Sequence, residues 1–230
     1  MWSFVLALLT PAFAGTLTFA PDAESATEVR WSDAGANVVL EKFAAAEGVI
    51  GSEVSGDGKF AFAWHQPKGK SLRVSVYDLQ AKQRISSFSP GYGGTLVFSA
   101  ANTLVLTRGC GTSCHVLTVF DLNGKTLVDT GGTLNEVSPS RRYALVYSGF
   151  YSEPGFGSEP GPSSLIDLAT GAVLVRSSVT ESGELGVEAV MWGVGDATVV
   201  LTIVAREGGT APPRYLRLAP DGTAAWVASP

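Results

Sequence analysis

Apolar and polar positions follow one order five times along the chain. An apolar residue is followed by a small residue, then by four turn-forming residues, and then by a run of apolar or β-branched residues. The small residue stands five positions before that run each time, at Ser32, Ser55, Ser99, Ser138 and Gly193. This spacing predicts a β-hairpin whose turn residues supply a positive or a preset φ.

A second pattern follows each of the last four hairpins. A third strand ends near Asp78, Asp121, Asp167 or Arg217, a short polar turn comes next, and a fourth strand is expected near residues 84–88, 126–128, 172–176 and 224–227. These four markers follow one another at intervals of 43, 46 and 50 residues. Four antiparallel strands repeating every 40–50 residues or so are typical of β-propeller blades.

At these residues the chain resembles the TolB-type, WD40-like propeller repeats of exported bacterial proteins. Blades of that family often contain Ser-Pro-Asp-Gly-Lys, a strand, and then an aromatic-x-x-Asp-Leu segment. The nearest match here is Ser-Gly-Asp-Gly-Lys at residues 55–59, and the resemblance extends from Val49 to the C-terminus. It implies an all-β fold that recognises a ligand or a protein through its loops.

We therefore expect an all-β protein, a small β-propeller-like ring of four or five antiparallel four-stranded blades. The first hairpin is short, so we expect residues 15–20 or the Trp31 hairpin to complete an end blade beside the C-terminal strand, which leaves no long bare edge. An open or sandwich-like stack of the same hairpins is the alternative. A helix is expected only over residues 41–47, where good helix formers precede Gly48.

Composition agrees with sheet burial and narrows the partners. Apolar residues make up 45% of the 230 positions and charged residues only 16%, so a sizeable core is available. The net charge is -5, and no run of Lys or Arg is long enough to cover a phosphate backbone. We therefore expect no nucleic acid among the partners.

The N-terminus has the features of an export signal. An apolar run over residues 4–9 precedes Ala12-Phe13-Ala14, which matches the A-x-A cleavage pattern. We expect residues 1–14 to be a signal peptide and 15–230 to be a single periplasmic or extracellular domain. Because no Lys or Arg precedes the run, a buried first strand is the alternative. The longest later apolar run, residues 197–205, falls short of the ~20 residues that span a bilayer, so we expect no membrane span in the mature chain.

The two cysteines, Cys110 and Cys114, enclose only three residues, and a turn there can bring them within disulfide range. An oxidising compartment favours a disulfide. A metal site that adds His115, or two free thiols, are the alternatives.

Motifs for catalysis are absent from the sequence: it has no G-x-S-x-G, H-E-x-x-H, calcium-loop or G-x-G-x-x-G pattern. We assign no catalytic residue, metal ligand or cofactor. His65 is interpreted as a structural histidine, with a general base as the alternative. Asp121, which begins Asp-Leu-Asn-Gly, is interpreted as a turn residue rather than half of a calcium loop.

The best candidate for binding is the long connection over residues 149–162. It exceeds an ordinary hairpin loop and carries aromatic and acidic side chains but no basic one. Aromatic faces beside carboxylates suit a cationic or carbohydrate-like ligand, or a basic side chain of a partner protein. The proposed binding residues are Phe150, Tyr151, Glu153, Phe156 and Glu159; a spacer or a disordered loop is the alternative.

The sequence thus favours a non-catalytic exported binding module for an unknown protein or small molecule. One rival is a hydrolase or lyase that gathers His65 with carboxylates, the candidates being Glu153, Glu159, Glu181 and Glu184. Another is a structural component of a secreted assembly.

Overall fold

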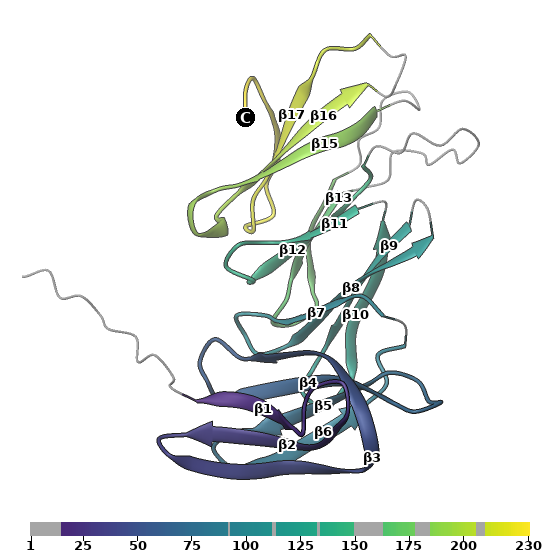
Figure 1. Ribbon diagram of the computed structural model, residues 1–230. Coiled ribbons are helices and arrows are strands. Elements are labelled where there is room, and N and C mark those ends of the chain that lie inside the picture. Colours follow the sequence, from purple (N-terminus) through teal and green to yellow (C-terminus); the bar gives the residue numbers. More distant parts are fainter. Residues whose placement is uncertain are drawn as a thin grey trace, which may run out of the picture. The chain divides into compact units, whose positions relative to one another are not determined.

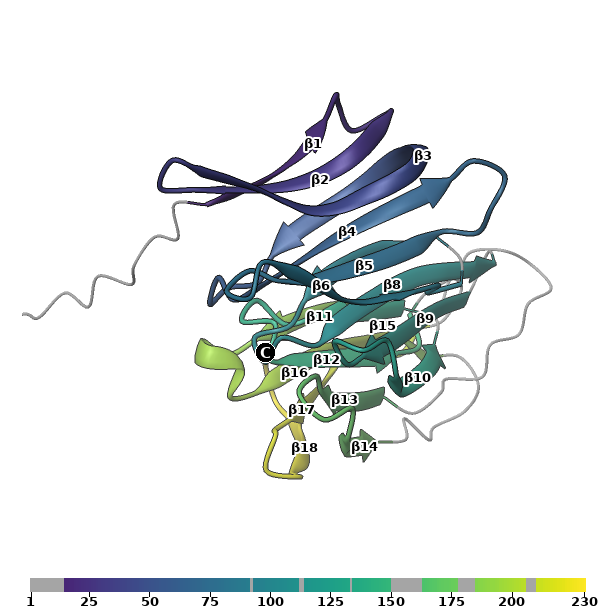
Figure 2. The same ribbon diagram turned by 90° about the horizontal axis from the view of Figure 1, so that it is seen from below.

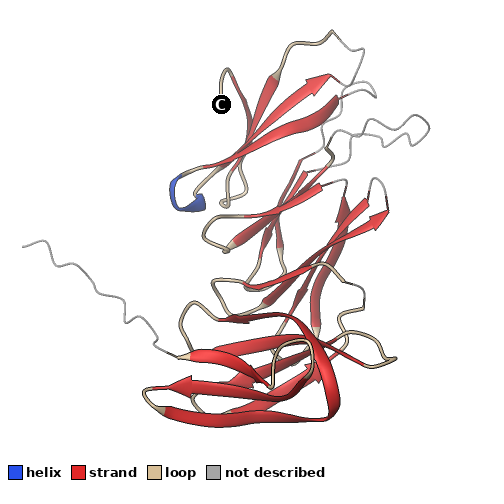
Figure 3. Cartoon of the chain, in the orientation of Figure 1, coloured by secondary structure: helices blue, strands red, loops and turns tan. Residues whose placement is uncertain are grey.

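The computed structural model of the protein is built from antiparallel strands (Figures 1 and 3). It describes residues 15–91, 93–111, 114–132, 134–149, 163–177, 185–205 and 210–230. The chain divides into two compact units, residues 1–85 and 86–230. Each unit is described by itself.

The first unit contains a sheet of six strands in sequence order, although its last strand runs on into the second unit (Figure 2). The strands are β1 (Thr16–Ala20), β2 (Ala26–Asp33), β3 (Ala36–Val54), β4 (Phe60–Pro67), β5 (Arg73–Asp78) and β6 (Gln83–Phe88). β3 has 19 residues; its first half pairs with β2 and its end pairs with β4. The end of β3 with β4, β5 and β6 therefore forms a four-stranded antiparallel unit of the expected kind.

Side chains from the two halves of this sheet share one core. Val29 and Trp31 of β2 and Leu40 of β3 cluster with Ala61 and Tyr77 of β4 and β5. Irregular pairing interrupts β3 between Val49 and Gly51 on the β4 side, and bulges of this kind bend a strand. The sheet therefore folds over, so that the early strands cover one face of β4 and β5.

The helix expected over residues 41–47 is wrong, because this segment is part of β3. Lys42 pairs with Glu28 of β2, and Glu47 pairs with both Ala26 of β2 and Pro67 of β4. A helix of two turns is marginal by itself, and the ladders on either side outweigh the helix propensity of these residues.

The second unit holds three sheets of four strands, each an antiparallel meander (Figure 1). The second sheet has β7 (Thr95–Phe98), β8 (Leu104–Gly111), β9 (Cys114–Phe120) and β10 (Thr126–Gly132). The third has β11 (Leu134–Val137), β12 (Tyr143–Tyr147), β13 (Ser163–Asp167) and β14 (Val173–Ser177). The fourth has β15 (Leu185–Trp192), β16 (Val199–Ala205), β17 (Arg214–Leu218) and β18 (Ala224–Val227). The all-β, four-stranded repeat expected from the sequence is confirmed.

Successive sheets of the second unit pack face to face, and β12 contributes to both interfaces. Its residues Ala144 and Val146 pack with Val105 and Val119 of the second sheet. Its alternate residues Tyr143, Leu145 and Tyr147 join the core of the fourth sheet. All five β12 residues are buried, which explains why the strand is apolar throughout rather than alternating.

In four of the five repeats the small residue closes the turn into the second strand of a four-stranded unit. Oγ of Ser55 accepts a hydrogen bond from the amide of Phe60 (3.0 Å), and Oγ of Ser138 accepts one from Tyr143 (3.1 Å). Ser99 does the same for the amide of Thr103 (3.1 Å). At Gly193, where no hydroxyl is available, Thr198 Oγ1 lies only 2.6 Å from the place of an added Cβ. The regular spacing in the sequence is therefore a property of turn hydrogen bonding.

The aspartates of the second pattern close the other turn. Asp78, Asp121 and Asp167 accept hydrogen bonds from the amides two or three residues later, at 2.7–2.9 Å. Asp221 has the same role in the fourth sheet, accepting from the amide of Thr223 (2.9 Å). Asp121 is thus a turn residue, as predicted.

The N-terminal strand adds to an end sheet, as expected, but its partner differs from the one expected. β1 pairs with β2, and the C-terminal strand β18 pairs with β17, instead of the two ends pairing with each other. The cause is local: Asp22 accepts hydrogen bonds from the amides of Glu24 (3.0 Å) and Ser25 (2.8 Å) and so closes a turn that leads from β1 directly into β2. Among the described residues the only helical segment is the turn η1 (Val194–Asp196), and none forms a helix able to cross a membrane.

Replacing Ser55 by Ala tests the turn function of the repeated small residue. The amide of Phe60 loses its acceptor, so we expect the free energy of unfolding to fall by about 1–2 kcal/mol. Urea unfolding followed by tryptophan fluorescence measures the change. Ser52→Ala, at an exposed position of β3, is the matched control and should change stability by less than about 0.5 kcal/mol. Equal effects of the two substitutions would contradict the assignment.

Candidate functional site

The loop residues proposed from the sequence lie outside the described part of the chain. This applies to Phe150, Tyr151, Glu153, Phe156 and Glu159, and also to Glu181 and Glu184. Binding through these residues therefore stays a prediction.

The two cysteines lie at the tip of the β8–β9 hairpin. Cys110 is near the end of β8, Cys114 begins β9, and Cys114 pairs with Gly111 across the hairpin. The backbone thus puts the two positions on facing strands, as the disulfide prediction requires. The disulfide itself stays a prediction.

His65 on β4 belongs to a buried polar group in the first unit. Its Nδ1 lies 2.5 Å from Oε2 of Glu47 on β3, and its Nε2 lies 3.1 Å from Oγ of Ser75 on β5. The ring of Phe43 stacks on the imidazole at 4.7 Å between centroids. All polar atoms of the imidazole therefore have partners inside the protein.

A second part of this group follows along β5. The hydroxyl of Tyr77 donates to Oε2 of Glu41 (2.7 Å), and Glu41 also forms an ion pair with Arg84. Burial and the neighbouring charge of Glu41 both raise the pKa of Tyr77 above its usual value. The group therefore draws side chains from β3, β4, β5 and β6.

Glu47, His65 and Ser75 have the composition of a nucleophilic triad, in which a histidine lies between an acid and a serine. Their burial argues against that use. Ser75 is 0% exposed and His65 only 2%, so a substrate carbonyl has no path to the hydroxyl in this structure. The geometry fits a hydrogen-bonded structural group, in keeping with the first interpretation of His65. Sequence reasoning missed its partners because it put Glu41 and Glu47 in a helix, whereas both lie on β3.

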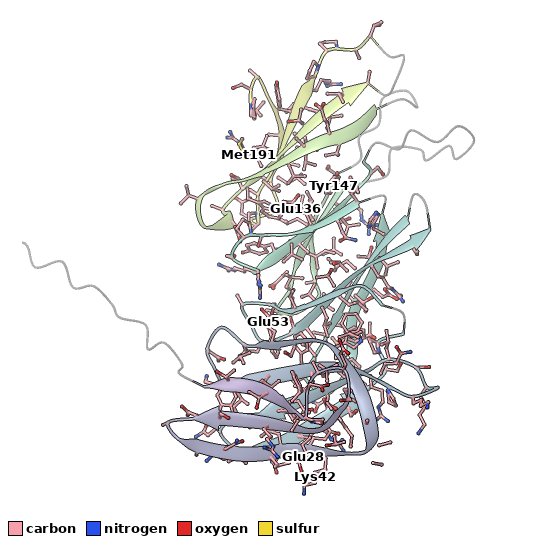
Figure 4. All side chains as sticks on the ribbon, viewed as in Figure 1. Glu28, Lys42, Glu53, Glu136, Tyr147 and Met191 are labelled. Atoms are coloured by element: carbon pink, nitrogen blue, oxygen red, sulfur yellow. The ribbon has the colours of Figure 1, made fainter. Side chains whose placement is uncertain are left out.

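Another half-buried carboxylate, that of Glu136 on β11 (Figure 4), also forms a hydrogen bond. It accepts a hydrogen bond from the indole of Trp192 on β15 (2.8 Å), which ties the third sheet to the fourth. Burial, followed by the charge of Glu136, raises the pKa of Tyr147 to about 12. Charged pairs elsewhere, such as Glu28 with Lys42 at 3.5 Å, lie at the surface. In the described residues, no three His, Cys, Asp or Glu side chains gather as a metal site.

An open pocket of about 550 Å³ lies in the second unit, where turns of the third and fourth sheets meet. The β11–β12 turn brings Arg142 and Tyr143, and the β15–β16 turn brings residues 195–198. The end of β17 and the following turn bring Arg217, residues 219–221 and Thr223. All three turns belong to the repeated hairpins, so the pocket is a product of the strand-turn repeat.

Hydrogen bonds hold the acidic residues of this pocket in place. Asp196 is buried and accepts from the hydroxyl of Ser140. Asp221 accepts from the amide of Thr223 (2.9 Å) and from its hydroxyl (2.8 Å). These two hydrogen bonds, the amide one first, lower the pKa of Asp221, so it is ionised at neutral pH.

The two arginines of the pocket have fewer interaction partners than its aspartates. The guanidinium of Arg142 lies over the ring of Tyr143, 5.0 Å from its centroid. Within the described part of the chain, neither Arg142 nor Arg217 forms an ion pair. Sequence reasoning missed this site, because its residues come from turns up to 81 positions apart and no local motif joins them.

Comparison with known proteins gives likenesses in structure only. No family model matches the chain, and no curated protein matches it. TolB from Acinetobacter baumannii matches over 92% of this chain and 51% of its own, with 14% identity and a TM-score of 0.37. A prolyl endopeptidase matches over 93% of this chain and 35% of its own (12%, TM-score 0.45), and an oligogalacturonate lyase in complex with manganese over 84% and 56% (15%, TM-score 0.39).

The expected likeness to TolB is confirmed, since TolB is among the matched structures. The chain spans about half or less of the length of the TolB and endopeptidase chains. At these identities and TM-scores the likeness says nothing about activity, and we base no functional argument on it.

Replacing Tyr77 by Phe tests the buried polar group. Glu41 loses its hydroxyl donor while the ring packing is kept, so we expect the free energy of unfolding at pH 7 to fall by about 1–2 kcal/mol. Because the folded-state pKa of Tyr77 is raised, the stabilisation is complete below the unfolded value of about 10 and is lost as the pH rises further. The difference between the wild type and Tyr77→Phe should therefore shrink above pH 10 or so.

Urea unfolding at a series of pH values measures both effects. Tyr215→Phe is the matched control, because the Tyr215 hydroxyl has no hydrogen bond among the described residues. It should change stability at pH 7 by less than about 0.5 kcal/mol. A Tyr77→Phe protein as stable as the wild type at pH 7 would refute the contribution of this hydrogen bond.

Proposed function

We propose that the protein is an exported, non-catalytic binding module whose ligand occupies the pocket between the third and fourth sheets. One contrast carries the proposal. The side chains that resemble catalytic machinery, Glu47, His65 and Ser75, are sealed in a core, whereas the pocket opens to solvent. A ligand can reach the pocket but cannot reach the serine.

The size and construction of the pocket support this proposal. Its volume of about 550 Å³ is in the usual range for small-molecule sites, roughly 300–1,000 Å³. Its residues are held by turns that end packed strands, and loops on a rigid β scaffold often bind ligands. Tyr143 is anchored in the core behind the pocket, so the floor of the site is fixed before a ligand arrives.

Export is part of the same proposal. The apolar run and A-x-A pattern in residues 1–14 support a cleaved signal peptide. Cys110 and Cys114, on facing strands of one hairpin, support a disulfide formed in an oxidising compartment. The periplasm or the extracellular space is the proposed location.

A hydrolase is the second candidate, and the triad-like hydrogen bonding of His65 is the observation that favours it. It requires the two layers of the first unit to separate far enough to admit a substrate. The binding function therefore depends on the second unit, and the hydrolase function depends on the first.

A thermal-shift screen of the secreted protein distinguishes the two candidates. The probes are amino acids, organic acids, sugars, metal ions and a periplasmic extract, together with ester substrates for turnover. We expect a ligand that raises the melting temperature, because it binds only the folded state. Ala197→Trp, which fills the pocket, should abolish the shift, whereas Ala211→Trp, at an exposed position away from it, should not.

Three results would contradict the proposal. Ester turnover that disappears in Ser75→Ala would support the hydrolase. A shift that survives Ala197→Trp but is lost on replacing Tyr151 and Phe156 by Ala would move the site to the loop predicted from the sequence. No shift with any probe or extract would leave the structural component as the remaining candidate.

Intact-mass analysis of the secreted protein tests export and the disulfide. We expect the mature chain to begin at Gly15 and to take up iodoacetamide at both cysteines only after reduction. Replacing both cysteines by Ser should lower stability modestly, by up to about 2 kcal/mol, because the closed loop is short. An uncleaved N-terminus would overturn the proposed signal peptide. Labelling without reductant would overturn the proposed disulfide.

A further inference from the structure

We propose that the pocket between the third and fourth sheets recognises the carboxylate of a small organic acid that also carries an apolar group, through Arg142 and Arg217. This inference rests on the proposed function, in which the same pocket is the binding site. It adds the chemical class of the ligand and the two residues that select it.

Both arginines are exposed and border the pocket. Arg142 follows the Ser138 turn, and its own carbonyl accepts a hydrogen bond from the amide of Leu168 (3.1 Å), which fixes the backbone there. Arg217 alternates along β17 with the core residues Leu216 and Leu218, so its side chain starts on the face away from that core. Among the described residues neither guanidinium has a carboxylate partner.

An unpaired guanidinium presents a planar fork of N–H donors, which matches the two oxygens of a carboxylate. Carboxylates of the protein are present in the pocket, but Ser140 and Thr223 already donate to Asp196 and Asp221. The guanidiniums of Arg142 and Arg217, by contrast, have no carboxylate partner among the described residues. These unpaired donors favour a ligand that brings its own acceptor oxygens.

The two aspartates also limit the charge of the ligand. Asp221 is ionised at neutral pH, and Asp196 lies buried in the same pocket. A phosphate group carries about −1.5 to −2 charges at pH 7 and is repelled more strongly by this acidic residue than a singly charged carboxylate is. The charge balance of the pocket thus favours the carboxylate.

The apolar requirement comes from the rest of the lining. Ala197, Ala219 and Pro220 offer no hydrogen-bonding side chain. An aliphatic group on the ligand would cover this surface and gain from its burial.

A matched pair of ligands tests the carboxylate directly. N-acetyl-L-leucine and N-acetyl-L-leucinamide share the aliphatic side chain and differ at the acid. Each is titrated into ¹⁵N-labelled secreted protein, with amide shifts of Gly195, Ala197, Thr198 and Thr223 as the readout. Inorganic phosphate is titrated in parallel. We expect saturable shifts with the acid, and an affinity at least about tenfold lower for the amide and for phosphate.

Substitutions assign the effect to the two arginines. Arg142→Gln and Arg217→Gln should each weaken binding of the acid about tenfold, and Arg→Lys at either position should weaken it less, because charge is kept while the fork is lost. Arg176→Gln is the matched control, since Arg176 is exposed on β14 outside the pocket, and it should bind as the wild type does. Unchanged melting temperatures show that the variants remain folded.

Each other outcome overturns the inference. Equal affinity for the acid and the amide, with both lost in Ala197→Trp, would keep the pocket as the binding site but remove the carboxylate from its recognition. Tighter binding of phosphate would replace the carboxylate by a phosphoryl group. If the acid does not shift these amides while the thermal-shift screen finds a ligand sensitive to Ala197→Trp, the proposed function stands and this inference fails.

Discussion

Burial on both faces of β4, β8, β12 and β16, the second strand of each four-stranded unit, is the interaction on which the rest of the structure depends. All five residues of β12 are buried, and β4, β8 and β16 each have a run of at least three buried residues. Such strands need every backbone polar group satisfied within the protein, which requires regular ladders and tightly closed turns. The core therefore requires the hydroxyls and carboxylates that close the turns, such as those of Ser138 and Asp167.

This construction also separates the groups that touch solvent from those that do not. In the first unit, the side chains of His65 and Ser75 are buried between two layers and are hydrogen-bonded to each other there. In the second unit, the turns leave Arg142 and Arg217 exposed beside a pocket. A ligand can therefore reach the side chains of the turns but not the buried group around His65. The proposed binding function follows from this separation.

The strand order could be read from the sequence, since a turn residue at a fixed distance from an apolar run is local information. The prediction failed where non-local pairing decides: residues 41–47 have helix formers, yet two neighbouring strands hold them extended within β3. The pocket was missed for a related reason. Arg142 and Asp221 are far apart in sequence and meet only because the third and fourth sheets stack, which no periodicity reveals.

The length of β3 has a mechanical consequence for the first unit. β3, a single strand of 19 residues, supplies a hydrogen-bonded edge to β2 and another to β4. Detaching the layer that covers the Tyr77 core therefore means breaking one of these ladders. We therefore expect residues 15–85 to melt as one cooperative block rather than as a lid and a base.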